Sequence, residues 1–233
     1  MNIKEISLQP RKLILILALL MLISGCALWK SKENLRNVPE ALYKQGYDDY
    51  QHSRYEKAIV NFQRLKEEYP LHELAIRAEL GIADAQFSMK EYGYAEIAYN
   101  DFLNLHPANE NLSYVMYQIG ICHYNQLLEI DRDQTETWKA LKEFEKLIAR
   151  FPTSKFSFLA EKKVRECKSR LAEHEYYVGE IYFKMKRYKA ALLRFENIRK
   201  NYANLGLDYK VKFTMEEASK QLAIVEAKKV SAK

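Results

Sequence analysis

Two stretches of the chain decide its fold: ALYKQGYDDYQHSRYEKAIVNFQRLKEEYP at residues 41–70 and ELGIADAQFSMKEYGYAEIAYNDFLNLHP at residues 79–107. Each carries, in the same order, a small residue, an alanine, an aromatic residue and a proline. All four positions recur at an offset of 37 residues. The matched pairs are Gly46 with Ala83, Ala58 with Ala95, Phe62 with Tyr99, and Pro70 with Pro107.

Two further copies follow. In the third copy, Gly120 lies 37 residues after Ala83. The second half of the third copy lies 45 residues after the second half of the second copy. The third copy therefore carries eight extra residues between its two helices. That second half holds Ala140, Phe144 and Pro152. The fourth copy is marked by Gly179, Tyr188, Ala191 and Phe195, with Ala203 in place of the proline.

This spacing is typical of tetratricopeptide repeats, in which two antiparallel helices cross at small residues and a proline follows the second helix. We therefore predict an all-α tetratricopeptide-repeat solenoid of four to five helix pairs in a right-handed superhelix. The alternative is a generic helical bundle. Residues 157–187 are expected to form one long helix or two with a short break, and the C-terminus an incomplete helix pair. The predicted repeats cover about 39–72, 76–109, 113–154 and 172–205, within a solenoid of residues 38–233 and with a C-terminal cap at 207–230.

The first 25 residues read as a signal peptide, with a basic start and an apolar run from Leu13 to Ile23 that is too short to span a bilayer. Its last residues, with Cys26, resemble the lipobox of bacterial lipoproteins. The resemblance implies S-diacylglycerol and N-acyl groups on Cys26, and Ala27 after it favours the outer membrane. An ordinary signal peptide with an incidental cysteine is the alternative. Residues 26–37 read as a lipidated tether.

Composition argues against several functions. The 233-residue chain has a net charge of +6, and without its leader it has 34 basic and 30 acidic residues, which is too balanced to indicate nucleic-acid binding. The five histidines form no metal-ligand motif, and there is no phosphate loop or nucleophile elbow. We predict no catalytic residue, no metal and no cofactor. For the remaining cysteines, Cys122 and Cys167, we expect two buried thiols, because neighbouring helices usually hold Cα atoms too far apart for a disulfide; a disulfide between them is the alternative.

A peptide-binding groove is the function that remains. The first helix of each repeat is expected to line it, and tyrosine offers a large amphipathic contact area at low entropic cost. Such a groove suits an extended peptide with aromatic or apolar side chains, although any of these side chains could instead pack between repeats. The expected groove residues are Tyr43, Tyr47, Tyr50, Phe87, Tyr117 and Tyr124.

The extra residues of the third repeat, IDRDQTET at 130–137, are a second candidate site. Asp133 and Glu136 resemble a capping box at the start of a helix. A charged loop at a fixed place on a solenoid is also a natural contact site.

Together these features resemble the BamD family of lipoproteins. The residues that carry the resemblance are the lipobox, the repeats, Asp131-Arg132-Asp133-Gln134, Leu171-Ala172 with His174-Glu175, and Arg194. The resemblance implies a scaffold on the periplasmic face of the outer membrane that receives unfolded β-barrel proteins. It also implies that Arg194 contacts the periplasmic domain of the barrel subunit BamA, and that accessory lipoproteins of the complex are further partners.

The chain departs from the family at Leu193, where asparagine is usual, at Ala203, and in a last helix that looks short. Two other functions stay open: a different repeat lipoprotein, such as a pilotin for a pilus secretin, and an enzyme of peptidoglycan or lipids.

Overall fold

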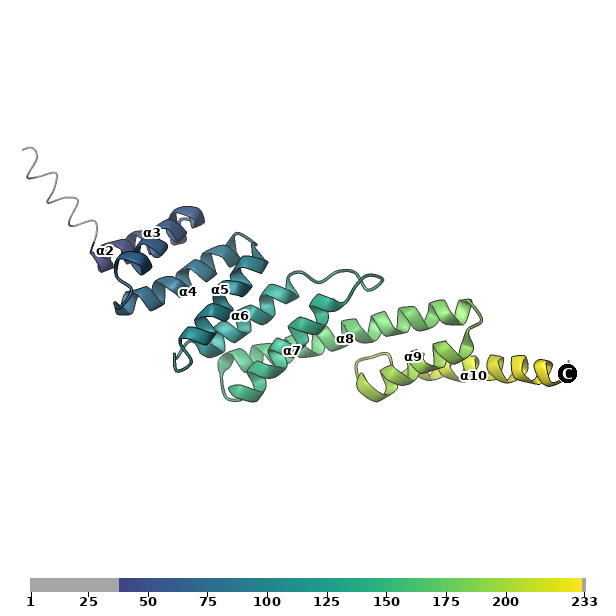
Figure 1. Ribbon diagram of the computed structural model, residues 1–233. Coiled ribbons are helices and arrows are strands. Elements are labelled where there is room, and N and C mark those ends of the chain that lie inside the picture. The colour runs from purple at the N-terminus through teal and green to yellow at the C-terminus, as the bar shows by residue number, and fades with distance from the viewer. Residues whose placement is uncertain (1–37, 232–233) are drawn as a thin grey trace, which may run out of the picture. The chain divides into compact units, whose positions relative to one another are not determined.

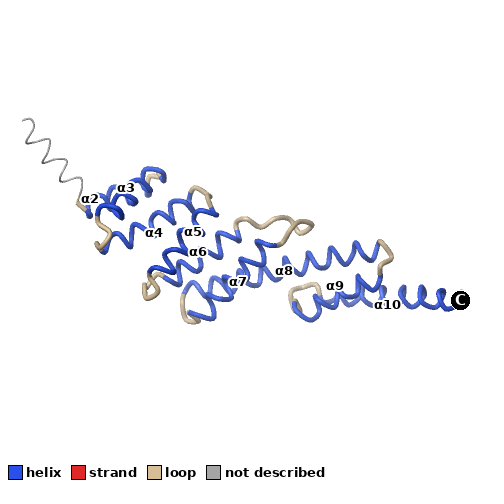
Figure 2. Tube along the Cα trace, viewed as in Figure 1, coloured by secondary structure: helices blue, strands red, loops and turns tan. Residues whose placement is uncertain are grey.

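A computed structural model describes residues 38–231. The predicted leader, Cys26 and the tether lie outside the described residues. The chain divides into two compact units, 1–85 and 86–233, which are described here one at a time. Residues 38–231 contain nine helices. Figures 1 and 2 show helices and loops but no strand over this range, so the predicted all-α class is confirmed for it.

The first unit is one helix pair followed by most of a third helix. It contains α2 (Pro39–Gln51), α3 (Tyr55–Glu68) and the larger part of α4 (Glu73–Ser88). Phe62 of α3 lies at its centre, and a Cβ on Gly46 or Gly81 would come within 2.7 or 2.6 Å of the Phe62 ring. The aromatic residue of the repeat therefore fills the space between its own first helix and the next one, and only glycine allows that approach.

The second unit continues the same pattern. Each helix packs against the next along the chain, and the repeat aromatics Phe144 and Phe195 are fully buried over the first helix of their own pairs. The helices are α5 (Tyr92–Leu105), α6 (Leu112–Tyr124), α7 (Thr135–Arg150), α8 (Lys155–Lys184), α9 (Tyr188–Asn201) and α10 (Asp208–Ser231). These helix pairs, with small and aromatic residues at their crossings, are a tetratricopeptide-repeat fold.

The long segment after the third repeat is one unbroken helix. α8 has 30 residues, or about 45 Å at 1.5 Å per residue. Ser154 caps its start by accepting a hydrogen bond from the Phe156 N–H at 3.2 Å. Its first part packs against α7, and its second part carries Gly179, which faces Phe195 of α9. One helix thus joins the third repeat to the fourth.

Helix ends follow the prolines. α3, α5 and α7 each end two residues before a repeat proline, as predicted. α9 ends at the equivalent place although Ala203 replaces the proline, because Asn204 and Gly206 adopt positive φ values of 63° and 94° and turn the chain.

The C-terminus is a single helix, α10, which agrees with the incomplete helix pair expected there. The helix is not short, as the sequence had suggested, since it has 24 residues. Val211 and Ala218 of α10 are buried, which fixes one side of this helix on the solenoid.

Over residues 38–231 the structure contains no helix with both the length and the apolar character needed to cross a bilayer.

Candidate functional site

The tyrosines of the first unit differ in how far they are free to bind a peptide. Tyr43 stacks on Tyr47, with ring centroids 6.4 Å apart, and also packs on Phe62 at 5.8 Å. Burial raises the pKa of Tyr43. Tyr50 packs edge-on against Tyr55. Tyr47 is 48% exposed and presents most surface, so it is the strongest peptide-contact candidate of the three.

The aromatic candidates of the second unit are more tied to their neighbours. Phe87 packs edge-on against Tyr92, with centroids 5.5 Å apart. Tyr117 lies between Phe144 and Phe156, at 5.8 and 5.7 Å. Phe87 and Tyr117 therefore belong largely to the packing between helices, the alternative that the sequence left open.

Tyr124 ends α6 in a polar setting. Its hydroxyl donates a 2.7 Å hydrogen bond to Glu166 Oε2, and Lys163 Nζ lies 3.8 Å from the centre of its ring. Lys163 also donates to Glu166 at 2.8 Å, and this hydrogen bond lowers the pKa of Glu166. Tyr124 is thus held at the edge of a charged surface on α8.

Residues 125–134, here called the insertion loop, join α6 to α7. Gln134 is buried, donates to the carbonyl oxygens of Glu129 at 2.8 Å and Arg132 at 3.1 Å, and accepts from Thr137 Oγ1 at 2.8 Å. Asp131, Arg132 and Asp133 are exposed. Gln134 therefore has a structural role, while the side chains of Asp131 and Arg132 lie on the surface of the loop.

The expected capping box is not formed. α7 begins at Thr135 with Gln134 at the N-cap, so Asp133 lies one residue before the cap, where its Oδ1 accepts a 2.9 Å hydrogen bond from the Thr135 N–H. Glu136 binds His123 Nδ1 through Oε2 at 2.7 Å and Lys139 through Oε1 at 2.9 Å. The box prediction is therefore wrong, because the helix starts one residue later than the motif requires and the Glu136 carboxylate has other partners.

His123 is the residue that sequence reasoning missed. Its side chain is only 4% exposed, with Nδ1 against Glu136 of α7 and Nε2 3.4 Å from Glu96 of α5. Burial acts to raise the pKa of Glu136, but hydrogen bonds from Lys139 and His123 outweigh it and lower the pKa. The imidazole joins three successive helices, and no local motif in the sequence signals it.

The insertion loop is also fixed to α8. Arg170 Nη2 donates to the carbonyl oxygen of Leu128, and His174 Nδ1 lies 2.6 Å from that of Ile130. The loop is therefore a positioned element and His174 one of its supports.

Arg194 of α9 already has a carboxylate partner within the chain. Its Nη1 donates to both oxygens of Glu175 on α8, at 3.0 and 3.2 Å. The arginine side chain is 41% exposed, whereas that of Glu175 is 15% exposed. Among the described residues, the contacts of the Arg194 guanidinium with Glu175 are made through Nη1.

The family model described as "YfiO: Outer membrane lipoprotein" matches residues 36–233. The outer membrane protein assembly factor BamD of Rickettsia prowazekii is 30% identical over 182 residues, which are 78% of this chain and 72% of that protein. The BamD proteins of Caulobacter vibrioides and Vibrio cholerae are each 26% identical, over 84% and 89% of this chain and 65% and 90% of their own lengths. This chain belongs to the BamD family of outer membrane protein assembly factors.

Solved repeat structures resemble the chain more distantly. The TPR2AB domain of yeast Sti1, in complex with a pHSP90 peptide, gives a TM-score of 0.47 at 18% identity over 79% of this chain and 70% of that one. A tetratricopeptide-repeat protein of Thermus thermophilus gives 0.43 at 17% identity, over 78% and 98%.

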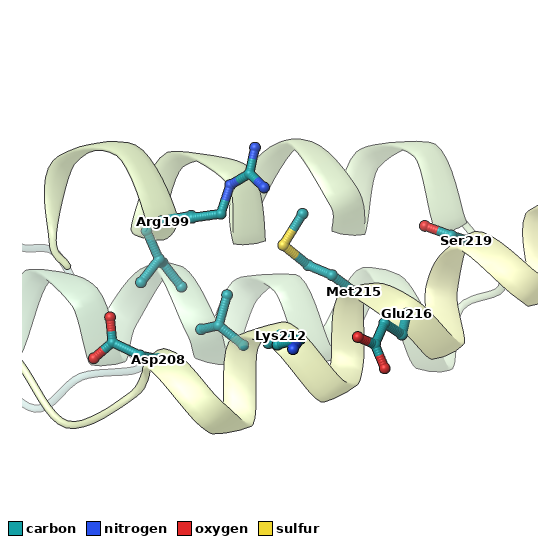
Figure 3. A pocket seen from close by; sticks show the side chains of 8 residues that line it. Arg199, Asp208, Lys212, Met215, Glu216 and Ser219 are labelled. Carbon is teal, nitrogen blue, oxygen red and sulfur yellow. The ribbon is translucent and has the colours of Figure 1, made fainter. Parts of the chain in front are cut away.

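Leu193, next to Arg194 in α9, is 73% exposed. A pocket of about 660 Å³ opens between α9 and α10, with Met215 pointing from α10 toward the helix that carries Arg199 (Figure 3). Charged residues of both signs border this α9–α10 pocket around an apolar floor. The principal residues are Ile198, Arg199, Asp208, Val211, Lys212 and Met215.

Cys122 and Cys167 are free, and both are fully buried. Burial raises the pKa of each thiol to about 12, so both remain protonated thiols at neutral pH. No cluster of three or more potential metal ligands occurs among residues 38–231.

Proposed function

We propose that this protein is a lipid-anchored scaffold on the periplasmic face of the outer membrane, where it binds the barrel subunit BamA and unfolded β-barrel proteins during their assembly. It acts by binding and positioning rather than by catalysis. Membership of the BamD family over residues 36–233 carries the proposal, because its relatives are named outer membrane protein assembly factors.

The proposed BamA contact is built around Arg194. Glu175 holds one edge of the guanidinium, and the other edge suits a carboxylate of the partner in a bidentate pair. Exposed Leu193 and the apolar floor of the α9–α10 pocket supply contact area beside it. A charged anchor next to apolar surface is the usual composition of an interface centre.

The proposed substrate contact uses aromatic side chains, taken separately in each unit. Tyr47 is the candidate of the first unit and Tyr124 that of the second, since tyrosine binds extended chains through both its ring and its hydroxyl. In this proposal Tyr43, Tyr50, Phe87 and Tyr117 support the contact surface mainly by packing against neighbouring rings.

The proposed membrane attachment is the acylated Cys26 at the end of the leader. Several acyl chains give stable anchoring, since each buried CH₂ contributes about 0.8 kcal/mol. Residues 26–37 would then connect the lipid to the solenoid.

The test is extraction of the tagged protein from its own host in mild detergent, followed by identification of the proteins that co-elute. A large outer-membrane barrel with repeated soluble periplasmic domains is the expected partner, together with smaller lipoproteins. Co-elution of a pilus secretin in its place would refute the assembly role and favour a pilotin.

A further inference from the structure

The exposed aromatic face of α2 lies beside the point where the described chain begins. Tyr47 is 48% exposed and stacks on Tyr43, with ring centroids 6.4 Å apart. The two residues are one helical turn apart, so their rings form one continuous surface along the helix. Val38 directly precedes α2 and is itself exposed. The chain before Val38 is therefore joined to the solenoid next to this surface, here called the Tyr43–Tyr47 face.

The tether, residues 26–37, has a composition that a simple spacer does not need. Its sequence after Cys26 is ALWKSKENLRN, in which Leu28, Trp29 and Leu35 are large apolar residues among polar ones. A segment that only spans a distance can be polar throughout. Trp29 is the one aromatic residue of the tether, and burying such a large ring against another surface is favourable. The composition therefore favours a docking place for Trp29.

The tether is long enough to reach the Tyr43–Tyr47 face. Tyr47 follows Val38 by nine residues, which is about 14 Å along the helix. Trp29 precedes Val38 by nine residues and can lie up to about 30 Å from it. This reach is about twice the distance required. The chain can therefore turn before α2 and place Trp29 against Tyr47.

The tether and the first unit carry opposite charge. Residues 27–37 have a net charge of +2, and residues 38–85, with nine acidic and six basic residues, have a net charge of −3. On α2 itself, the exposed carboxylates Glu40 and Asp48 flank the two tyrosines along the helix, with Lys44 between them. Such charges attract over about 10 Å at moderate ionic strength. The charged residues of the tether are Lys30, Lys32, Glu33 and Arg36.

A segment of the same chain needs little intrinsic affinity to occupy a face so close to its attachment point. Its effective concentration there is on the order of 1 mM. A contact with a dissociation constant of about 0.1 mM would then cover the face about nine-tenths of the time. One stacked aromatic ring supported by opposite charges is a contact of this modest kind.

We propose that the tether docks on the Tyr43–Tyr47 face of its own chain, with Trp29 against Tyr47, and shields this face until a substrate peptide displaces it. Only Ala27 and Leu28 separate Trp29 from Cys26, so a docked tether also holds the first unit close to the lipid anchor. The docking is argued from reach, charge and exposed rings. The shielding rests on the proposed function, since it requires that Tyr47 contacts substrate.

Tryptophan fluorescence tests the docking. The chain has two tryptophans, Trp29 and Trp138, so Trp138→Phe leaves Trp29 as the single fluorophore. The measurement uses the full-length protein extracted from its own membranes in mild detergent. In this background Tyr47→Ala should shift the Trp29 emission to longer wavelength and increase its quenching by acrylamide. Tyr94→Ala, at an exposed tyrosine of α5 in the second unit, is the matched control and should change neither.

Peptide affinity tests the shielding. The probe is a short fluorescent peptide in which aromatic and polar residues alternate. Trp29→Ser should bind this peptide roughly tenfold more tightly than the wild type, because a site that is open one-tenth of the time loses affinity in the same proportion. Trp138→Ser, the same substitution at an exposed tryptophan of α7, should leave the affinity unchanged.

Trp29 emission that does not respond to Tyr47→Ala would overturn the docking, show that Trp29 lies in the membrane or in water, and leave the proposed function standing. A response that disappears on dilution would overturn docking within one chain and indicate a second copy. Equal peptide affinity of Trp29→Ser and the wild type would overturn the shielding. If no variant binds the peptide, the proposed substrate contact and the shielding both fail, whereas the docking is decided by the emission alone.

Discussion

Arg194 Nη1 donates hydrogen bonds to both carboxylate oxygens of Glu175, joining α9 to α8 at 3.0 and 3.2 Å. Arg194, one of the residues that carry the family resemblance, is therefore held in place by a second residue of this chain. Arg194 therefore has two candidate roles. One is to stabilise the packing of α9 on α8, and the other is to contact a partner.

A charge swap distinguishes these roles. Arg194→Glu alone places two carboxylates together and should weaken both thermal stability and binding to the BamA periplasmic domain, the latter by at least about tenfold. The double variant Arg194→Glu with Glu175→Arg should regain thermal stability without regaining BamA binding. If binding also returns, Arg194 acts only through its internal pair.

Gly120 and Gly93 form a matched pair of substitutions. A Cβ on Gly120 would lie 2.5 Å from the buried ring of Phe144, so Gly120→Ala should lower the free energy of unfolding by about 1–3 kcal/mol. Gly93 is exposed in α5, and an added Cβ would have no atom within 4 Å, so Gly93→Ala should raise the free energy of unfolding by about 0.5–1 kcal/mol. Urea unfolding measures the free energy of each variant. Equal effects of the two substitutions would contradict the close packing of Gly120 on Phe144.

Gln134 should govern the order of the insertion loop. Gln134→Ala removes two donated hydrogen bonds and leaves the buried Thr137 hydroxyl without its acceptor, which should cost about 1–3 kcal/mol. Hydrogen exchange should accelerate across residues 125–134. Arg132→Ala, at an exposed position in the same loop, is the control and should change the free energy of unfolding by less than about 0.5 kcal/mol. Unchanged hydrogen exchange in the loop of Gln134→Ala would show that Gln134 does not order it.

Acid should weaken the contact between Tyr124, Lys163 and Glu166. The pKa of Glu166 is lowered from its ordinary 4.5, first by Lys163, so its contribution is present above that value and is lost as pH falls below it. Glu166→Gln should lower stability by about 1 kcal/mol at pH 7. The difference in stability between Glu166→Gln and the wild type should shrink below pH 4.5. A difference in stability that stayed constant with pH would argue against this ionised contact.

Membrane attachment should depend on the Cys26 thiol. Cys26→Ser removes the acylated atom and should move the protein from the membrane fraction to the soluble periplasm. Ser24→Ala keeps a small residue in the lipobox and should leave fractionation unchanged. Immunoblots of separated membranes measure both, and full membrane retention of Cys26→Ser would exclude the lipid anchor.

The helix pairs could be predicted from the sequence because their determinants are local and periodic. Small residues, a buried aromatic and a terminal proline recur at an offset of 37, and each helix is built from contacts a few residues apart. The eight extra residues also showed where the loop would lie. The C-terminal helix was harder to predict, because α10 follows the solenoid without a second helix or a closing proline.

The sequence by itself determined the repeat architecture, and its leader and motif residues indicated the family. Only the tertiary structure decided that His123 joins Glu96 to Glu136, that Arg194 rests on Glu175, and that the insertion loop is fastened to α8. These contacts join residues that lie 13 to 44 positions apart in the chain. Helical periodicity places a residue on a face of its own helix, but which charged partner it meets depends on how separate helices pack.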